Sequence, residues 1–212
     1  MERIFICNNR PLGLIILAGG RSRRMRRNKA LLPVPGGVLI ELILAKLRDR
    51  FAQVVVSVSD YEDFTFLSGV DLVPDPVPDQ GPMYGIYHAM GVSRYDKNFV
   101  IACDIPVIDV EFLQTLISAA AAADIAVPEN GGRLLEPLFA VYSQSIRSVM
   151  GELLEEGERS LLPLIERCRV KKVSLEGKTL MNLNTLEDYE RFLSTAKPVN
   201  SQNAKRKTTT ID

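Results

Sequence analysis

Four short apolar runs, each closed by polar or turn residues, constrain the fold of this 212-residue chain more than any other feature. The runs are GLIILAGG (13–20), FAQVVVSVSD (51–60), NFVIACD (98–104) and ADIAVPE (123–129). They are apolar on both faces, which is typical of strands in a parallel sheet that is covered on both sides. The sequence therefore predicts a mainly parallel sheet.

Segments with helical character separate these runs. Residues 38–51 place five aliphatic side chains on one helical stripe, namely Leu39, Ile40, Ile43, Leu44 and Leu47. Residues 109–123 form a second helical segment, and Asp109 is suited to cap its start. Strands that alternate with helices indicate right-handed βαβ units, so we expect an α/β fold.

The pattern changes after Val127. The stretch PENGGRLLEPLFAVY predicts a hairpin or long connection that turns at Gly131 and Gly132, followed by a strand over residues 138–142. We therefore expect an antiparallel insertion on the mostly parallel sheet.

Shorter elements follow in the C-terminal part. We expect helices over residues 145–155 and 160–168 and a strand over 170–175. A last helix begins in NTLEDYERFL, where Asn184 as N-cap and Glu187 three residues later resemble a capping box. Residues 1–193 are expected to form one domain. Residues 194–212 have few apolar side chains and predict a disordered polar tail.

Composition excludes several classes of function. The chain has 26 Lys and Arg residues and 26 Asp and Glu residues, so its net charge is zero. It therefore has no overall excess of positive charge of the kind that indicates binding to nucleic acid or to a membrane surface. No stretch approaches the roughly 18 apolar residues of a membrane span, and the start lacks the apolar run of a secretory signal. The three cysteines fit neither a disulfide framework nor a metal-ligand spacing. We expect a cytoplasmic protein with reduced thiols.

The segment LAGGRSRRMRRNKALLP (17–33) nevertheless concentrates six cations between residues 21 and 29. Ala18, Gly19 and Gly20 follow a strand, at the sheet edge where open α/β folds bind ligands. Backbone N–H groups there, with Arg24 and Lys29, suit a polyphosphate. The segment matches neither the P-loop nor the G-x-G-x-x-G pattern. Taken alone, its spacing is equally compatible with a solvated basic turn.

This segment resembles the L-A-G-G-x-S-x-R-M-G-x-D-K-A-L-L pattern of molybdenum cofactor guanylyltransferases. The matching residues are Leu17, Ala18, Gly19, Gly20, Ser22, Arg24, Met25, Lys29, Ala30 and Leu31. The resemblance extends from about Leu14 to Leu193. It implies a Rossmann-like nucleotidyltransferase fold and transfer of GMP from Mg²⁺-bound GTP to the terminal phosphate of molybdopterin, with release of pyrophosphate.

The resemblance also implies roles for individual residues. Arg24, Lys29 and Asp104 are the expected catalytic residues, and Asp104, in the family's C-D-x-P segment, is the expected Mg²⁺ ligand. One or two carboxylates suffice for Mg²⁺ because substrate phosphates and water complete its coordination. The expected nucleotide contacts are Leu17, Ala18, Gly19, Gly20, Lys29, Ser57, Asp75, Gly81 and Asp104.

Asp75 is the candidate for reading the base. Its carboxylate can accept hydrogen bonds from N1–H and N2–H₂ of guanine together, which the edge of cytosine cannot offer. Asp79 is the competing candidate, and a rigid surface turn would also explain this proline-rich stretch. His88, the single histidine, is expected to pack or lie at the surface rather than take part in catalysis.

Three further residues are expected on the pterin side. Arg133 precedes the family's E/H-P-L-x-A-x-Y strand, and Asn182 and Asn184 lie in its closing N-x-N-T segment. Each also has a purely structural explanation, because Arg133 can be an exposed hairpin charge and Asn184 a helix cap.

Three positions depart from the family pattern. Arg26 and Asn28 replace a usual glycine and aspartate, and Ser57 stands where many relatives have asparagine. Asn28 leaves the segment more positive, which is expected to tighten anion binding and slow pyrophosphate release. Two alternatives therefore remain open: cytidylyl transfer or another metabolite nucleotidyl transfer, and a non-catalytic nucleotide- or pterin-binding module. Proteins that deliver the pterin and receive the product are conceivable partners.

Overall fold

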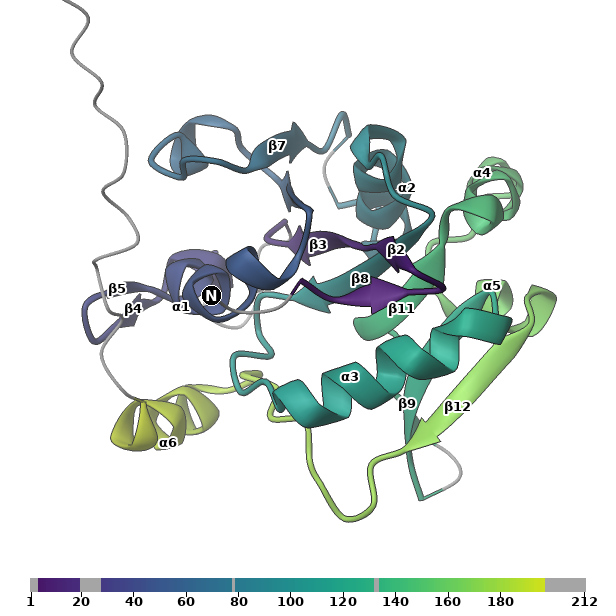
Figure 1. The fold of residues 1–212 in the computed structure, drawn as a ribbon. Helices are drawn as coiled ribbons and strands as arrows, with labels where there is room; N and C mark the ends of the chain where they lie inside the picture. Colours follow the sequence, from purple (N-terminus) through teal and green to yellow (C-terminus); the bar gives the residue numbers. More distant parts are fainter. Residues whose placement is uncertain (1–3, 20–27, 78, 132–133, 197–212) are drawn as a thin grey trace, which may run out of the picture.

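The structure, a computed structural model, describes residues 4–19, 28–77, 79–131 and 134–196. Its centre is an eight-stranded sheet in the order β10-β9-β11-β8-β3-β6-β7, with β12 beside β9 (Figure 1). The strands are β3 (Gly13–Leu17), β6 (Gln53–Val58), β7 (Asp71–Pro74), β8 (Lys97–Ala102), β9 (Ile125–Asn130), β10 (Leu134–Leu135), β11 (Phe139–Ser143) and β12 (Val170–Ser174). Only β10 and β11 run against the others, so both the mostly parallel sheet and its antiparallel insertion are confirmed.

The register of the central strands determines where a ligand can bind. Leu17, the last residue of β3, pairs with Ser57 of β6 on one side and with Ala102 of β8 on the other. β7 pairs in parallel with β6, and Val58 lies opposite Pro74. The carboxyl ends of four strands therefore meet at one edge, the usual ligand-binding edge of an open α/β sheet.

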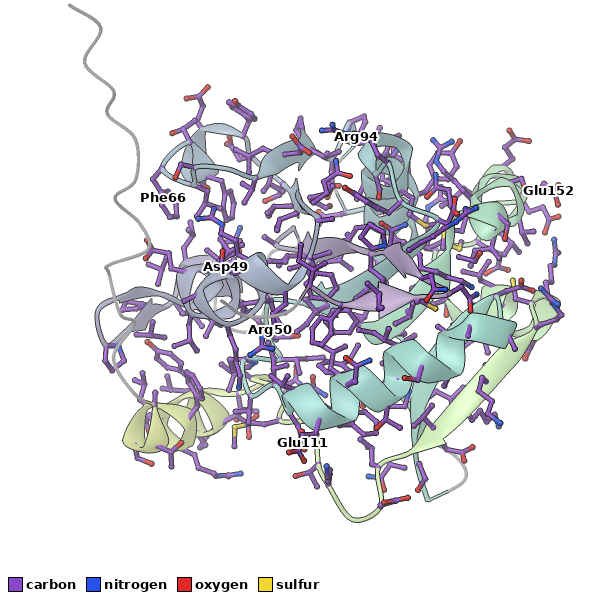
Figure 2. All side chains as sticks on the ribbon, in the orientation of Figure 1. Asp49, Arg50, Phe66, Arg94, Glu111 and Glu152 are labelled. Carbon is purple, nitrogen blue, oxygen red and sulfur yellow. The ribbon has the colours of Figure 1, made fainter. Side chains whose placement is uncertain are left out.

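Helices cover both faces of the sheet (Figure 1). They are α1 (Leu39–Leu47), α2 (Pro82–Val92), α3 (Val110–Ala119), α4 (Arg147–Glu155), α5 (Leu162–Arg167) and α6 (Leu186–Thr195). One core cluster joins α1 and α3 to Leu14 and Ile16 of β3, whereas a second joins α2, α4 and α5 to Ile15 and Leu17. Because successive strand side chains point to opposite faces, β3 contributes to both clusters. Figure 2 shows side chains filling the space between the helices and the sheet.

Smaller elements surround this core. An N-terminal hairpin pairs β1 (Ile6–Cys7) with β2 (Arg10–Pro11), and a second hairpin pairs β4 (Pro33–Val34) with β5 (Gly37–Val38). The second hairpin packs with α6 in a separate apolar cluster. Short 3₁₀ helices are η1 (Lys29–Leu31), η2 (Arg48–Arg50), η3 (Glu62–Phe64), η4 (Ala120–Ala122) and η5 (Gln144–Ile146). No helix in the described ranges is long and apolar enough to cross a membrane.

The expected helices are present with small shifts in their ends. The five stripe residues of α1 are all buried, and Asp109 caps α3 by accepting hydrogen bonds from two backbone N–H groups. The predicted cap of the last helix was wrong by one residue. Thr185 is the N-cap of α6 and forms a capping box with Asp188, not Asn184 with Glu187. The side chain of Asn184 is therefore available for another contact.

Candidate functional site

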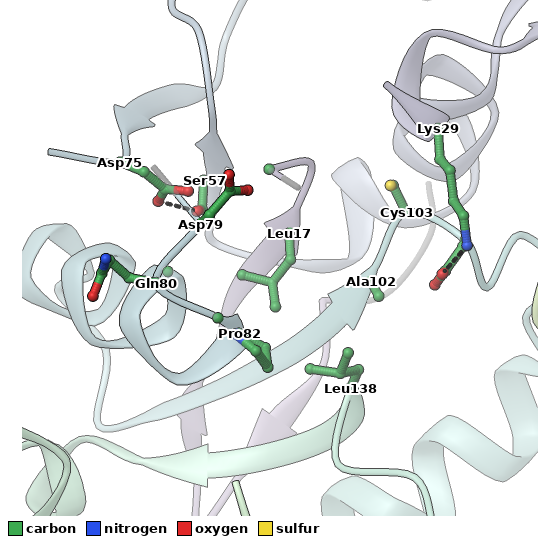
Figure 3. Close-up of a pocket in the computed structure, with 14 residues that line it drawn as sticks. Leu17, Lys29, Ser57, Asp75, Asp79, Gln80, Pro82, Ala102, Cys103 and Leu138 are labelled. Carbon is green, nitrogen blue, oxygen red and sulfur yellow. Dashed lines mark hydrogen bonds and ion pairs between the residues drawn. The ribbon is translucent and has the colours of Figure 1, made fainter. Parts of the chain in front are cut away.

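A cavity of about 420 Å³ opens at the carboxyl edge of the four central strands. Its lining comprises Leu17, Gly19, Lys29, Ser57, Asp75, Asp79, Gln80, Gly81, Pro82, Gly85, Ala102, Cys103, Asp104 and Leu138. Figure 3 shows Leu17 near the middle, with Asp75 and Ser57 on one side and Lys29 and Cys103 on the other. The volume lies within the range of small-molecule sites, and the polar groups lie toward two opposite ends.

Lys29 and Asp104 form the first of these ends. The Lys29 ammonium donates to Oδ2 of Asp104 at 2.9 Å and to Oδ1 of Asn184 at 3.1 Å. The ion pair is partly buried, since the two side chains are 15% and 24% exposed. Asp104 lies two residues after the end of β8, and its carbonyl accepts from the N–H of Leu183 at 2.8 Å, which holds the Asn182–Asn184 segment beside it. A cation is thus fixed against a carboxylate at the strand ends.

A second carboxyl group lies near this end. Glu136 is hydrogen-bonded to the side chain of Asn182, and burial raises the pKa of Glu136, with the negative charge of Asp104 acting in the same direction. Asn182 and Asn184 therefore both contact ionisable groups at this end of the site, and their contact with substrate stays a prediction.

Asp75 and Ser57 form the other end. The Ser57 hydroxyl donates to Oδ1 of Asp75 at 3.1 Å, and Ser57 itself is 2% exposed. Burial raises the pKa of Asp75, although the Ser57 hydrogen bond and the nearby His88 lower it. A Cβ at Gly19 would lie 2.7 Å from Oδ2 of Asp75, so any larger residue here would force this carboxylate to shift. Asp75, rather than the exposed Asp79, is therefore the carboxylate that is held in place.

His88 lies on α2 and packs edge-on against the rings of Tyr84 and Tyr87. Burial lowers the pKa of His88, which favours the neutral imidazole. His88 does not line the cavity, in agreement with the packing role expected from the sequence.

The start of α2 closes the cavity beside Asp75. Gly81 caps the helix with a φ of 81°, and a Cβ there would lie 3.0 Å from the carbonyl oxygen of Arg159. The Arg159 guanidinium donates to Oε1 of Gln80 at 2.8 Å. The sequence analysis did not single out Arg159, which reaches the cavity rim from the connection between α4 and α5. No local motif reveals this approach, because it depends on how α4 packs on α2.

Gly85→Ala is predicted to have opposite effects in two backgrounds. A Cβ at position 85 would lie 2.9 Å from the buried Ser57 hydroxyl oxygen, so overpacking should destabilise the protein by about 1–2 kcal/mol despite the better helix propensity of alanine. In a Ser57→Ala background the obstacle is gone, and the same change should stabilise the protein by about 0.5–1 kcal/mol. Urea unfolding of the four variants measures both effects. Equal effects in the two backgrounds would contradict this close packing.

The structure brings most of the predicted residues together. Leu17, Gly19, Lys29, Ser57, Asp75, Gly81 and Asp104 line the cavity, and Asn182 and Asn184 lie beside it. Ala18 is next to the cavity but buried, and its N–H donates to the carbonyl of Ser57 at 2.8 Å. Gly20, Arg24, Arg26 and Arg133 lie outside the described residues, as does the predicted tail from residue 197 onward. The tail was predicted to begin at residue 194, but α6 continues to Thr195.

The donor set at the strand ends fits a hard divalent cation. Asp104 is a partly exposed carboxylate that faces the cavity, and the described ranges contain no cluster of three or more His, Cys, Asp or Glu that could hold a metal alone. Mg²⁺ usually takes one or two protein carboxylates and completes its shell with phosphate oxygens and water. Cys103 is a poor candidate ligand for such a cation, because thiolates are soft ligands and Mg²⁺ prefers oxygen. Burial raises the pKa of its thiol to about 12.

Comparisons with known proteins agree with this geometry. A "probable molybdenum cofactor guanylyltransferase" from Pelotomaculum thermopropionicum is 36% identical over 83% of this chain and 82% of its own length. The crystal structure of molybdopterin-guanine dinucleotide biosynthesis protein A from Archaeoglobus fulgidus has a TM-score of 0.73 and 26% identity, over 86% of this chain and 97% of that one. A manganese complex of Rv0371c from Mycobacterium tuberculosis shares the fold at 20% identity and a TM-score of 0.67, over 88% of this chain and all of that one.

The family model for MobA-like NTP transferase domains matches residues 14–171, which includes the sheet edge and most of the cavity residues. The start of this range agrees with the family resemblance found in the sequence, but the match ends before the segment with Asn182 and Asn184, which the resemblance had included. With the mostly parallel sheet, the two-ended cavity and these relatives in agreement, the chain belongs to the family of MobA-like NTP transferase domains.

Proposed function

We propose that this protein transfers GMP from GTP to the terminal phosphate of molybdopterin and releases pyrophosphate. The observation that carries the proposal is the cavity itself. A carboxylate held by Ser57 stands at one end and an ammonium paired with a carboxylate at the other, separated by Leu17 of β3. A nucleoside triphosphate needs a base-reading group and a phosphate-binding group separated in this way.

The reaction requires little acid–base chemistry from the protein. A phosphate-monoester nucleophile has a second pKa of about 6 and is largely ionised at neutral pH. Its oxygen forms a bond to the α-phosphorus of GTP, while the bond from that phosphorus to the bridging oxygen breaks and pyrophosphate leaves with the electron pair. No proton has to be removed, which is consistent with the single histidine packing away from the cavity.

Catalysis then consists of alignment and charge stabilisation. The Lys29 ammonium can bind the oxygens of the leaving pyrophosphate, and Asn184 keeps the lysine side chain at the strand ends. Asp104 would hold a divalent cation, for which we propose Mg²⁺, and the bound ion supplies positive charge to the phosphates. Gly19 allows the backbone to approach the ligand closely, and Asp75 fixes the base.

Guanine is favoured over cytosine because the base-reading group is an acceptor. When ionised, Asp75 offers only lone pairs, and guanine presents two adjacent donors on its Watson–Crick edge. The curated relative named above carries the same assignment in its name. We further propose that the protein acts in the cytoplasm, where the substrate would be delivered and the product received by other proteins of the pathway.

The test is turnover of molybdopterin with GTP or CTP and Mg²⁺, compared with an Asp75→Asn variant. The amide loses one of two acceptor oxygens and the charge, so kcat/KM for GTP should fall roughly 30-fold, about 2 kcal/mol, with little change for CTP. Asp79→Asn is the matched comparison, because this second carboxylate lines the same cavity without the Ser57 hydrogen bond. A wild-type preference for CTP would refute guanylyl transfer, and a larger loss in Asp79→Asn would move base reading to Asp79.

A further inference from the structure

The side chain of Asn28 connects two parts of the chain that flank the basic segment. Its Nδ2 donates to the carbonyl oxygen of Ala18 at 3.1 Å, and its Oδ1 accepts from the N–H of Ala30 at 3.0 Å. The orientation of the amide follows from its partners, because a carbonyl can only accept and an N–H can only donate. One side chain thus bonds the chain just before residues 20–27 and just after them.

Both anchor points are firmly held. Ala18 is buried, and its N–H donates to Ser57 of the neighbouring strand. Ala30 is also buried, within η1, and the N–H of Leu31 donates to the backbone carbonyl of Asn28. Asn28 therefore fixes the end of β3 relative to Lys29, whose ammonium reaches Asp104.

We propose that Asn28 is a positioning residue for nucleotide binding: its amide ties Ala18 to η1 and thereby sets the distance between the glycine at the strand end and Lys29. The nucleotide part of this inference rests on the proposed function. The tie itself rests only on the two hydrogen bonds. Asn28 touches neither Lys29 nor Asp104 through any hydrogen bond in the described residues, so it acts through the backbone.

The amide of Asn28 can make both of these bonds, whereas an ionised carboxylate can make only one of them. Aspartate, the usual residue in the family pattern, would keep the bond from Ala30 but place a carboxylate oxygen against the Ala18 carbonyl, and two acceptors repel each other. The structure adds a second consequence to the missing negative charge expected from the sequence: Asn28 donates to the carbonyl at the strand end, which an ionised aspartate cannot do.

Two variants distinguish the loss of the hydrogen-bond donor at position 28 from the addition of a negative charge there. Asn28→Asp removes the donor and adds a charge, whereas Asn28→Ser keeps an acceptor suited to cap η1 but is too short to reach Ala18. Asn8→Asp is the matched control, because the Asn8 amide also donates to a backbone carbonyl, that of Ala121 at 3.0 Å, far from the cavity. The three variants and the wild type are compared as full-length protein.

The measurements are GTP binding with Mg²⁺, steady-state kinetics, and the rate of tryptic cleavage after the basic residues between 21 and 29. Both Asn28 variants should weaken GTP binding about tenfold, raise KM by a similar factor with kcat changed less than threefold, and accelerate cleavage in this segment. Asn8→Asp should match the wild type in all three.

Wild-type behaviour of Asn28→Ser would overturn the proposal, because capping of η1 alone would then explain Asn28. Wild-type behaviour of Asn28→Asp would do the same, since the donor would be dispensable. If the wild type binds no nucleoside triphosphate, the proposed function fails. Faster tryptic cleavage in both Asn28 variants, with Asn8→Asp unchanged, would still establish the tie in that case.

Discussion

Asp104→Asn is expected to lower kcat for guanylyl transfer about a thousandfold, equivalent to roughly 4 kcal/mol of transition-state stabilisation. Asp104 is the carboxylate at the end of β8 that lines the cavity and pairs with Lys29. The amide has nearly the same shape but no charge, so the proposed divalent cation would lose its protein ligand while the fold is preserved. Steady-state rates measured over a range of Mg²⁺ concentrations check this, and the variant should need far more Mg²⁺ for its residual activity.

Asp109→Asn is the matched control for this prediction. Asp109 lies five positions along the chain, caps α3 and pairs with Lys178, and does not line the cavity. Asparagine is also a good N-cap, so this variant should retain activity and lose little stability. Full activity of Asp104→Asn with unchanged Mg²⁺ dependence would remove Asp104 from the metal site.

The central strands β3, β6 and β8 were predictable because they are buried on both faces, whereas β7, which was not predicted, is only partly buried. A run such as GLIIL has no polar residue that would suit a surface, so it indicates a core strand before any partner is known. The stripe of α1 was equally clear, since its five apolar residues recur with helical spacing and all are buried. Such patterns can be recognised within one short segment, because they depend only on which side chains of that segment are buried.

The N-terminal hairpin was missed although its turn carries a local signal. Asn8 and Asn9 both have positive φ, at 53° and 60°, as the two-residue turn between antiparallel strands requires, and asparagine tolerates this conformation. The strands on either side have only two residues each, too few for the alternation that marks a hairpin. The two asparagines of the turn were therefore informative about the hairpin, whereas its strands were too short to be recognised.

The functional contacts at the site depended on tertiary structure. The sequence placed Asn184 at a helix cap, but Thr185 performs that role and leaves the Asn184 side chain to accept from Lys29, 155 positions away in the sequence. Glu136 and Arg159 similarly reach the site only because β11 and α4 pack where they do. Motifs identified residues that the structure brings together at the strand ends, whereas the partners of these residues depend on packing between distant segments.

Lys29→Met is expected to change two affinities in opposite directions. In the structure the ammonium occupies Oδ2 of Asp104, so a divalent cation must compete with it when no nucleotide is bound. Loss of the lysine should therefore tighten binding of Mn²⁺ alone, used as a spectroscopic probe, because a partly buried carboxylate is left without its cation. Binding of GTP and turnover should become weaker, since the charge that meets the phosphates is gone.

The expected loss in kcat/KM for GTP is about 300-fold, roughly 3.4 kcal/mol, which is within the range found when a donor to a developing negative charge is removed. Lys178→Met removes a cation from the surface pair with Asp109 and should change neither affinity. If Lys29→Met weakened Mn²⁺ binding as well, the lysine would organise the metal site instead of competing for it. Opposite changes would show that Lys29 moves its charge from Asp104 to the phosphates when the nucleotide binds, so that the ion pair seen here is the resting arrangement of the catalytic charges.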